Sequence, residues 1–103
     1  MGVPEGSQQA AAAFVRAWLD RDAKTRGPAL QEAATPALAE QMMLTDPDNI
    51  PKARPRGGPV LDDASTFSAQ FTQTLSTGLK MRVYLVAEPG ARYGWLATSV
   101  DRA

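Results

Sequence analysis

Residues 79–87 alternate apolar and polar side chains along their length. One set of alternate positions is apolar and the other is mostly polar: Leu79, Met81, Val83, Leu85 and Ala87 against Lys80, Arg82, Tyr84 and Val86. A period of two with β-branched and aromatic residues is typical of a strand with one buried face. Such a strand needs hydrogen-bonding neighbours and a cover over its apolar row, so the rest of the chain must supply both.

Two further strands are predicted around this one. Residues 64–75 alternate between a polar row, which indicates a face toward water, and a mostly apolar row: Phe67, Ala69, Phe71, Gln73 and Leu75. Residues 76–78, Ser-Thr-Gly, predict the hairpin turn into residues 79–87. Residues 88–91, Glu-Pro-Gly-Ala, have the pattern of a type II turn, and residues 93–100 predict a last strand.

The first half of the chain predicts helices. Residues 8–23 carry apolar side chains at helical spacing, and Ser7 is the expected N-cap. A short second helix is predicted over residues 28–34, after a stop at Gly-Pro. A third is predicted over residues 37–44, because Thr35 followed by proline is a strong start signal.

Helices followed by a meander of strands are typical of the α+β class. We therefore expect three N-terminal helices packed on a curved antiparallel β-meander of three to four strands. Helix 8–23, with Phe14 and Trp18, is expected to cover the apolar face of the sheet: Phe67, Phe71, Met81, Val83 and Leu85. At 103 residues the chain predicts one domain, residues 8–103, after a flexible N-terminus of residues 1–7.

Composition removes several kinds of chemistry. The chain has no Cys and no His, so disulfides, thiolate and imidazole catalysis are excluded and a zinc site is not expected. Lysine plus arginine equals aspartate plus glutamate, so no net charge attracts the chain to nucleic acid. The adjacent carboxylates Asp62 and Asp63 have no third ligand at a suitable spacing, and we read them as a solvated pair. No cofactor is expected.

A basic stretch rich in breakers, residues 52–59, predicts a loop without regular structure. Lys52, Arg54 and Arg56 make it a candidate docking loop for a protein partner, with a simply solvated loop as the alternative. Nucleic acid is disfavoured as the partner because no aromatic residues are interleaved to stack on bases.

Aromatic residues in and beside the strands are candidates for a partner interface. Tyr84, Tyr93 and Trp95 form this candidate set, since an edge strand with an aromatic residue is a natural place for a second chain to dock. For Trp95 the alternative is a place in the core, and for Tyr84 it is cross-strand packing. A separate candidate pocket between the first helix and the sheet would be lined by four large residues: Phe14, Trp18, Phe71 and Met81.

Four segments carry a resemblance to a known family: residues 14–20 (FVRAWLD), 35–39 (TPALA), 45–51 (TDPDNIP) and 93–96 (YGWL). With the elements predicted around them, they resemble the nuclear transport factor 2-like (cystatin-like) α+β fold. The likeness is greatest to small actinobacterial domains of that fold, including those akin to the conjugation-pore TcpC and VirB-type secretion components.

That resemblance implies a non-enzymatic assembly domain of a conjugative-transfer or type IV secretion-like apparatus. Such a domain lies outside the cytoplasmic membrane, is joined to it by an upstream helix, and associates with itself or with other subunits. The chain departs from the pattern by showing no membrane segment, and a cytoplasmic location is the alternative. The same fold also hosts pocket proteins and isomerases, which form the alternative function, but no aspartate is expected on the inner sheet face and no catalytic residue is assigned.

Overall fold

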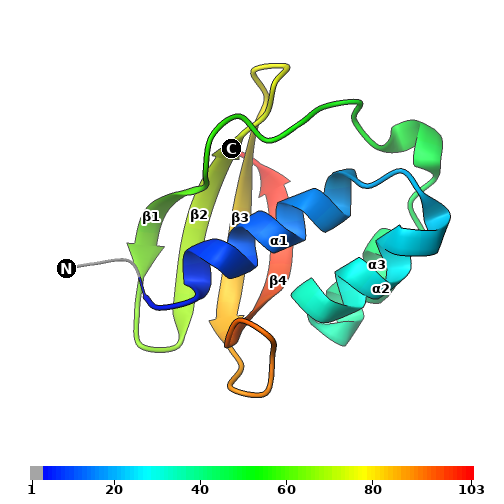
Figure 1. The fold of residues 1–103 in the computed structure, drawn as a ribbon. Coiled ribbons are helices and arrows are strands. Elements are labelled where there is room, and N and C mark those ends of the chain that lie inside the picture. Colours follow the sequence, from blue (N-terminus) through cyan, green and yellow to red (C-terminus); the bar gives the residue numbers. More distant parts are fainter. Residues whose placement is uncertain (1–3) are drawn as a thin grey trace.

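The structure is a computed structural model that describes residues 4–103. Three helices come first, α1 (Ser7–Leu19), α2 (Ala23–Ala33) and α3 (Pro36–Met43), followed by a short 3-10 turn, Pro47–Asn49. Four strands complete the chain: β1 (Val60–Ala64), β2 (Ser68–Thr74), β3 (Lys80–Ala87) and β4 (Trp95–Arg102). They form one antiparallel sheet in the order β1-β2-β3-β4 (Figure 1). The predicted α+β fold, with helices preceding an antiparallel meander, is confirmed.

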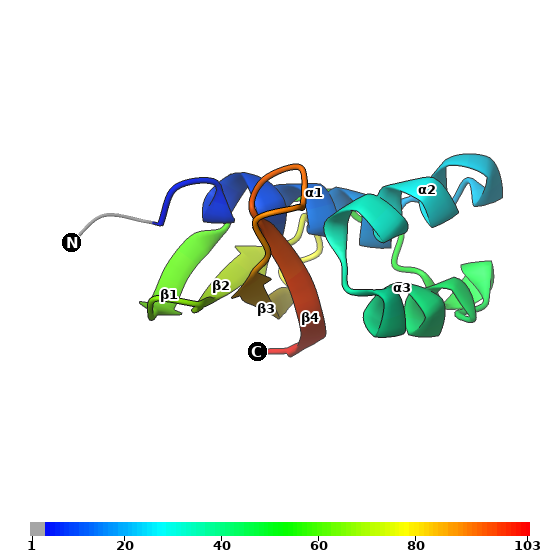
Figure 2. The ribbon, with the colours of Figure 1, turned by 90° about the horizontal axis from the view of Figure 1, so that it is seen from below.

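Helix α1 crosses one face of the sheet and buries the core beneath it. Phe14 and Val15 of α1 are fully buried, as are Phe71, Val83 and Leu85 of the two central strands. Figure 2 shows α1 and α2 on one side of the sheet, α3 beside β4, and no helix over the opposite face. The alternation of β2 and β3 therefore predicts the correct buried and solvent-facing rows.

The strand predicted over residues 64–75 is wrong at its start. Two strands occupy this part of the chain, because β1 ends at Ala64 and a turn separates it from β2. Phe67 lies in that turn and is 73% exposed rather than part of the core. The pairing of β1 with β2 shifts register between Leu61 and Asp63. This bulge breaks the alternation by which a strand is recognised in a sequence.

The boundary between the first two helices also differs from the prediction. Helix α1 ends at Leu19, and α2 begins at Ala23 because the Asp22 side chain accepts a hydrogen bond from the backbone N–H of Lys24. Pro28 lies inside α2, where it removes one backbone hydrogen bond without ending the helix. The cap at Thr35 is confirmed by its side chain, which accepts from the Leu38 N–H.

The segment before α1 is held against the domain. Ser7 is the first residue of α1 and is buried, so it is not the predicted N-cap; Gly6 precedes it in a left-handed conformation. The indole Nε1 of Trp95 donates to the Glu5 carbonyl at 3.0 Å. Within the segment predicted as a flexible N-terminus, residues 1–7, Ser7 thus belongs to α1 and Glu5 contacts Trp95, and residues 1–3 lie outside the described part.

Both edges of the sheet are poorly suited to accept a further strand. On the β4 edge, the N–H of Thr35 already donates to the Ala97 carbonyl at 2.9 Å. On the other edge, β1 is short and bulged and exposes the carboxylates Asp62 and Asp63. Short, bulged and charged edges are the usual protection against edge-to-edge pairing. The broad surface that stays open is the face of the sheet opposite α1.

Candidate functional site

The three aromatic residues of the candidate interface do not share a surface. Trp95 is 7% exposed and belongs to the core. The prediction of Trp95 as an interface residue is therefore wrong, and the alternative of a core position is correct. Tyr84 is half-buried on the open sheet face, on the row opposite the core. Tyr93 precedes β4 and lines a groove beside α1, with the Arg92 guanidinium 5.4 Å from its ring centre.

The residues of the candidate pocket between α1 and the sheet are packed core side chains. Phe14 and Phe71 are fully buried, Met81 is buried, and Trp18 packs against the same cluster. None of these four residues lines the surface hollows beside α1, the basic loop, α3 or the open sheet face. We therefore place no ligand between helix α1 and the sheet.

The basic loop is exposed and is tied to the sheet. Lys52, Arg54 and Arg56 all expose their side chains to solvent. The N–H of Arg56 donates to the Thr74 carbonyl at 2.8 Å, and the N–H of Ser76 donates to the Arg54 carbonyl at 2.8 Å. The prediction of a loop without regular structure holds, but backbone bonds fix its position beside the end of β2.

One basic residue outside this loop, Arg26 of α2, is buried and has a structural role. Arg26 is 6% exposed, and its guanidinium donates to the carbonyls of Trp18, Asp20 and Met42. Burial lowers the pKa of this guanidinium, while the charge of Asp20 opposes that shift. The available signal is that Arg26 shares a helix face with Leu30, one turn later, which is also buried.

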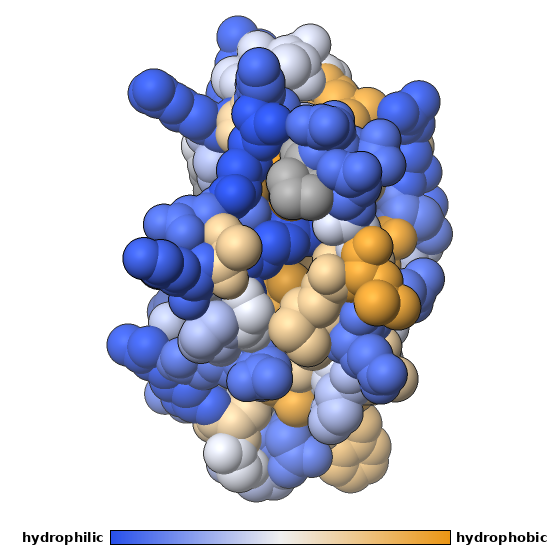
Figure 3. Space-filling view, turned by 90° about the vertical axis from the view of Figure 1, so that its right-hand side faces the viewer, coloured by the Kyte–Doolittle hydropathy of each residue, from blue (hydrophilic) through white to orange (hydrophobic). Residues whose placement is uncertain are grey.

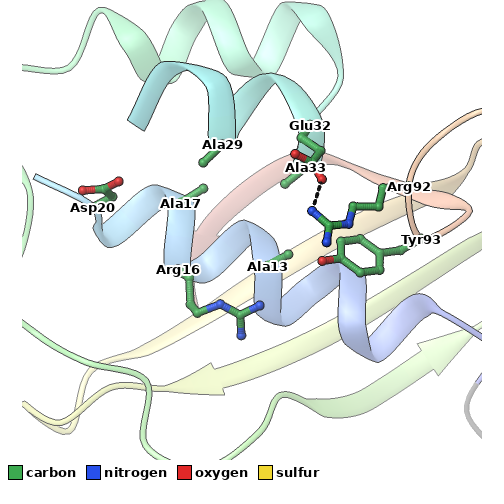
Figure 4. A pocket seen from close by; sticks show the side chains of 9 residues that line it. All are labelled: Ala13, Arg16, Ala17, Asp20, Ala29, Glu32, Ala33, Arg92 and Tyr93. Atoms are coloured by element: carbon green, nitrogen blue, oxygen red, sulfur yellow. Dashed lines mark hydrogen bonds and ion pairs between the residues drawn. The ribbon is translucent and has the colours of Figure 1, made fainter. Parts of the chain in front are cut away.

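A groove of about 240 Å³ lies between α1 and α2 (Figure 4). Its floor is made of four alanines: Ala13, Ala17, Ala29 and Ala33. At one end Arg92 and Glu32 form an exposed ion pair at 2.6 Å, and a hydrogen bond with Glu32 raises the pKa of Arg92. Arg16 and Asp20 lie apart from this pair in Figure 4. The groove thus combines an alanine floor with one exposed ion pair at its end.

A small apolar surface lies at the end of the molecule formed by α2 and α3. Figure 3 shows this end, where apolar side chains gather among hydrophilic ones. Met43 is 41% exposed and Leu44 is 83% exposed, beside a hollow lined in part by Pro36 and Ala39. Isolated exposed apolar residues are common on protein surfaces, and this surface is separate from the sheet face.

The open sheet face carries a row of polar side chains that crosses all four strands. The Thr72 hydroxyl on β2 donates to the Asp62 carboxylate on β1, and Thr72 lies opposite Arg82 on β3. Arg82 in turn lies opposite Asp101 on β4. A hydrogen bond with Tyr84, together with the charges of Asp101 and Asp62, raises the pKa of the Arg82 guanidinium. The row thus places the positive charge of Arg82 between the negative charges of Asp62 and Asp101 on the open sheet face.

A second row, at the level of Tyr84, is less charged. Gln70 on β2 lies opposite Tyr84, which lies opposite Ser99 on β4. A shallow hollow of about 180 Å³ opens here, lined in part by Asp63 and Thr98. A register shift lies on each side of this hollow. One is next to Asp63 in the pairing of β1 with β2, and the other is next to Tyr84 in the pairing of β3 with β4. Bulges re-aim side chains and are frequent beside functional surfaces.

Within residues 4–103, no three or more His, Cys, Asp or Glu residues gather as they would to hold a metal ion. Over the same part of the chain, every helix is too short or too polar to cross a membrane. Comparisons with models of known protein families, with curated proteins and with solved structures found no match to this chain.

Proposed function

We propose that the chain is a non-enzymatic assembly domain that associates with a second copy of itself through the open face of its sheet. The observation behind this proposal is that a complete sheet face has no helix over it, while the two edges are blunted. That face carries Asp62, Arg82 and Tyr84 at defined positions on paired strands.

The charges on this face select one arrangement of two copies. In a face-to-face pair related by a twofold axis along β2, β1 of each copy lies over β3 of the other. Asp62 then faces Arg82 of the second copy, and the same contact repeats by symmetry. An axis along β3 would place Arg82 over itself, and an axis between β2 and β3 would bring Asp62 over Asp101. Of these three axes, only the one along β2 pairs opposite charges, and facing sheets about 10 Å apart leave room for both side chains.

The size of the overlap sets the strength of the association. Three strands about 4.8 Å apart and about seven residues long cover a projected area on the order of 350 Å² per copy. A standard stable interface buries about 800 Å² per partner, so we expect weak, concentration-dependent association. Weak contacts of this kind become effective when other subunits hold several copies together, as in a multi-subunit apparatus.

The resemblance to the nuclear transport factor 2-like fold supports the same role. Domains of that fold that resemble this chain belong to conjugation and secretion components, and an apparatus of that kind is the setting we propose. It would place the domain outside the cytoplasmic membrane, through an anchor that precedes residue 1 in the native gene product. Protease protection of the native gene product in intact cells tests this location separately from the self-association.

Charge exchange across the proposed contact is the direct test. Asp62→Arg alone and Arg82→Glu alone should each weaken self-association about tenfold, because two attractive pairs per dimer become repulsive. An equimolar mixture of the two variants should associate again, since each altered residue then faces its opposite. Sedimentation velocity over a concentration series measures all three samples.

Asp101→Arg is the matched control. It reverses a charge on the same face, opposite Arg82 in the same copy, but on β4, outside the overlap. Its association should equal that of the unaltered chain. If Asp101→Arg disrupts association as strongly as Asp62→Arg, or if the mixture of variants fails to recover, the twofold contact along β2 is refuted.

A further inference from the structure

A second surface lies at the end of the sheet that carries the hairpin at residues 76–78. Here the chain between the 3-10 turn and β1 passes close to the C-terminal end of α1 and to Ser76 (Figure 1). These segments enclose a shallow hollow of about 560 Å³. Three cationic residues line it, Arg21 from the α1–α2 link and Lys52 and Arg54 from the basic loop. The fold thus brings together basic residues that are about thirty positions apart in the sequence.

Two hydrogen bonds fix the backbone of Arg54 beside Ser76 in this hollow. The N–H of Arg54 donates to the Ser76 hydroxyl at 3.0 Å, and the N–H of Ser76 donates back to the Arg54 carbonyl at 2.8 Å. The buried Gln73 side chain donates to the Gly57 carbonyl at 3.1 Å, which holds the following part of the loop. A positioned charge loses less conformational entropy on binding than the same charge on a mobile loop.

The lining defines the chemistry of a ligand. Lys52 and Arg54 carry the charge on which a ligand would act, and no carboxylate occurs among the described residues that line the hollow, so an anion complements these two residues. The floor includes Leu19, Pro51 and Ala53, which provide an apolar surface between the cations. No aromatic side chain lines it, so nucleic-acid bases would find nothing to stack on. A concave site with an apolar floor also suits a side chain better than a flat lipid surface.

We infer that this hollow binds an acidic, partly apolar segment of a partner protein. Carboxylates of the segment pair with Lys52 and Arg54 on the rim, and an apolar side chain between them covers the floor at Leu19 and Ala53. This inference does not rest on self-association, because the hollow shares no lining residue with the sheet-face contact.

A synthetic peptide of alternating glutamate and leucine is a suitable probe. We expect the whole chain to bind it, measured by fluorescence anisotropy, and to bind a peptide of alternating lysine and leucine not at all. Arg54→Glu should weaken binding about three- to tenfold, and Lys52→Glu similarly, because each replaces an attractive pair by a repulsive one. Binding should weaken further as added salt screens the charges.

Arg56→Glu is the matched control, because it makes the same change in the same loop at a residue that does not line the hollow. It should leave peptide binding within about twofold of the unaltered chain. Equal losses in Arg54→Glu and Arg56→Glu would mean a diffuse charge effect and would overturn the proposal. So would tighter binding of oligothymidylate or of phosphatidylserine vesicles than of the acidic peptide. Circular dichroism of each variant confirms that its fold is retained.

Discussion

A single buried guanidinium joins the ends of two helices. Arg26 donates to carbonyls at the C-terminal end of α1 and to the Met42 carbonyl near the end of α3. The last carbonyls of a helix have no partner within the helix, so a buried helix end needs a donor from elsewhere. Asp20 follows α1, and a hydrogen bond from Thr25 lowers the pKa of the Asp20 carboxyl. The helical layer is therefore held by polar contacts as well as by apolar packing.

Replacing this guanidinium should destabilise the whole domain. Arg26→Met keeps a long side chain but leaves buried carbonyls without a donor, and it should cost about 2–4 kcal/mol of unfolding free energy. Lys24→Met, an exposed position on the same helix, is the control and should change stability by less than about 0.5 kcal/mol. Urea unfolding followed by circular dichroism measures both. Similar small costs for the two variants would contradict the structural role of Arg26.

At the scale of elements, the sequence predicts β2 and β3 because their alternation is unbroken, and it predicts most of β4 although the pairing of β3 with β4 shifts register beside Tyr84. It misses β1 because a bulge at Asp62 interrupts the period of two, and its only half-buried apolar residue is Leu61. The start of α2 is missed for another reason: Gly27 and Pro28 are strong local stop signals. The Asp22 cap and the burial of Arg26 outweigh these stop signals. The cap could have been predicted from the sequence, because aspartate is a preferred N-cap residue.

Two phenylalanines, one just before β2 and one in its middle, test this assignment. Phe71 is fully buried beneath α1, whereas Phe67 lies in the preceding turn with most of its surface exposed. Phe71→Ala should cost about 3–5 kcal/mol, because it removes a large core side chain and leaves a cavity. Phe67→Ala should cost less than about 0.5 kcal/mol. Thermal or urea unfolding compares the pair directly, and a reversed order would mean that the faces of β2 are exchanged.

At the scale of the whole molecule, composition and pattern predict the layers but not which loops meet. The polar row of β2 correctly indicates an open sheet face. The basic loop is visible in the sequence, yet its neighbour Arg21 comes from the link between α1 and α2. Their meeting depends on where α1 ends and on how the loop crosses the sheet. Trp95 likewise looks like an edge-strand aromatic in the sequence, because its partner, the Glu5 carbonyl, lies near the other end of the chain.

The contact between the segment before α1 and the residues just before β4 depends on Gly6. This residue has φ +81°, and a Cβ added to it would overlap the carbonyl oxygen of Tyr93, just before β4. Gly78, in the β2–β3 hairpin, has a similar φ of +90° but no atom within 4 Å of an added Cβ. Gly78→Ala should therefore cost only the strain of a left-handed alanine, about 1–2 kcal/mol. Gly6→Ala should cost about 3 kcal/mol or more. It adds to the same strain a clash of the new Cβ with the Tyr93 carbonyl, which would push residues 4–7 away from β4. The difference in unfolding free energy between the two variants measures the contact itself, and equal costs would show that the segment before α1 does not pack against Tyr93.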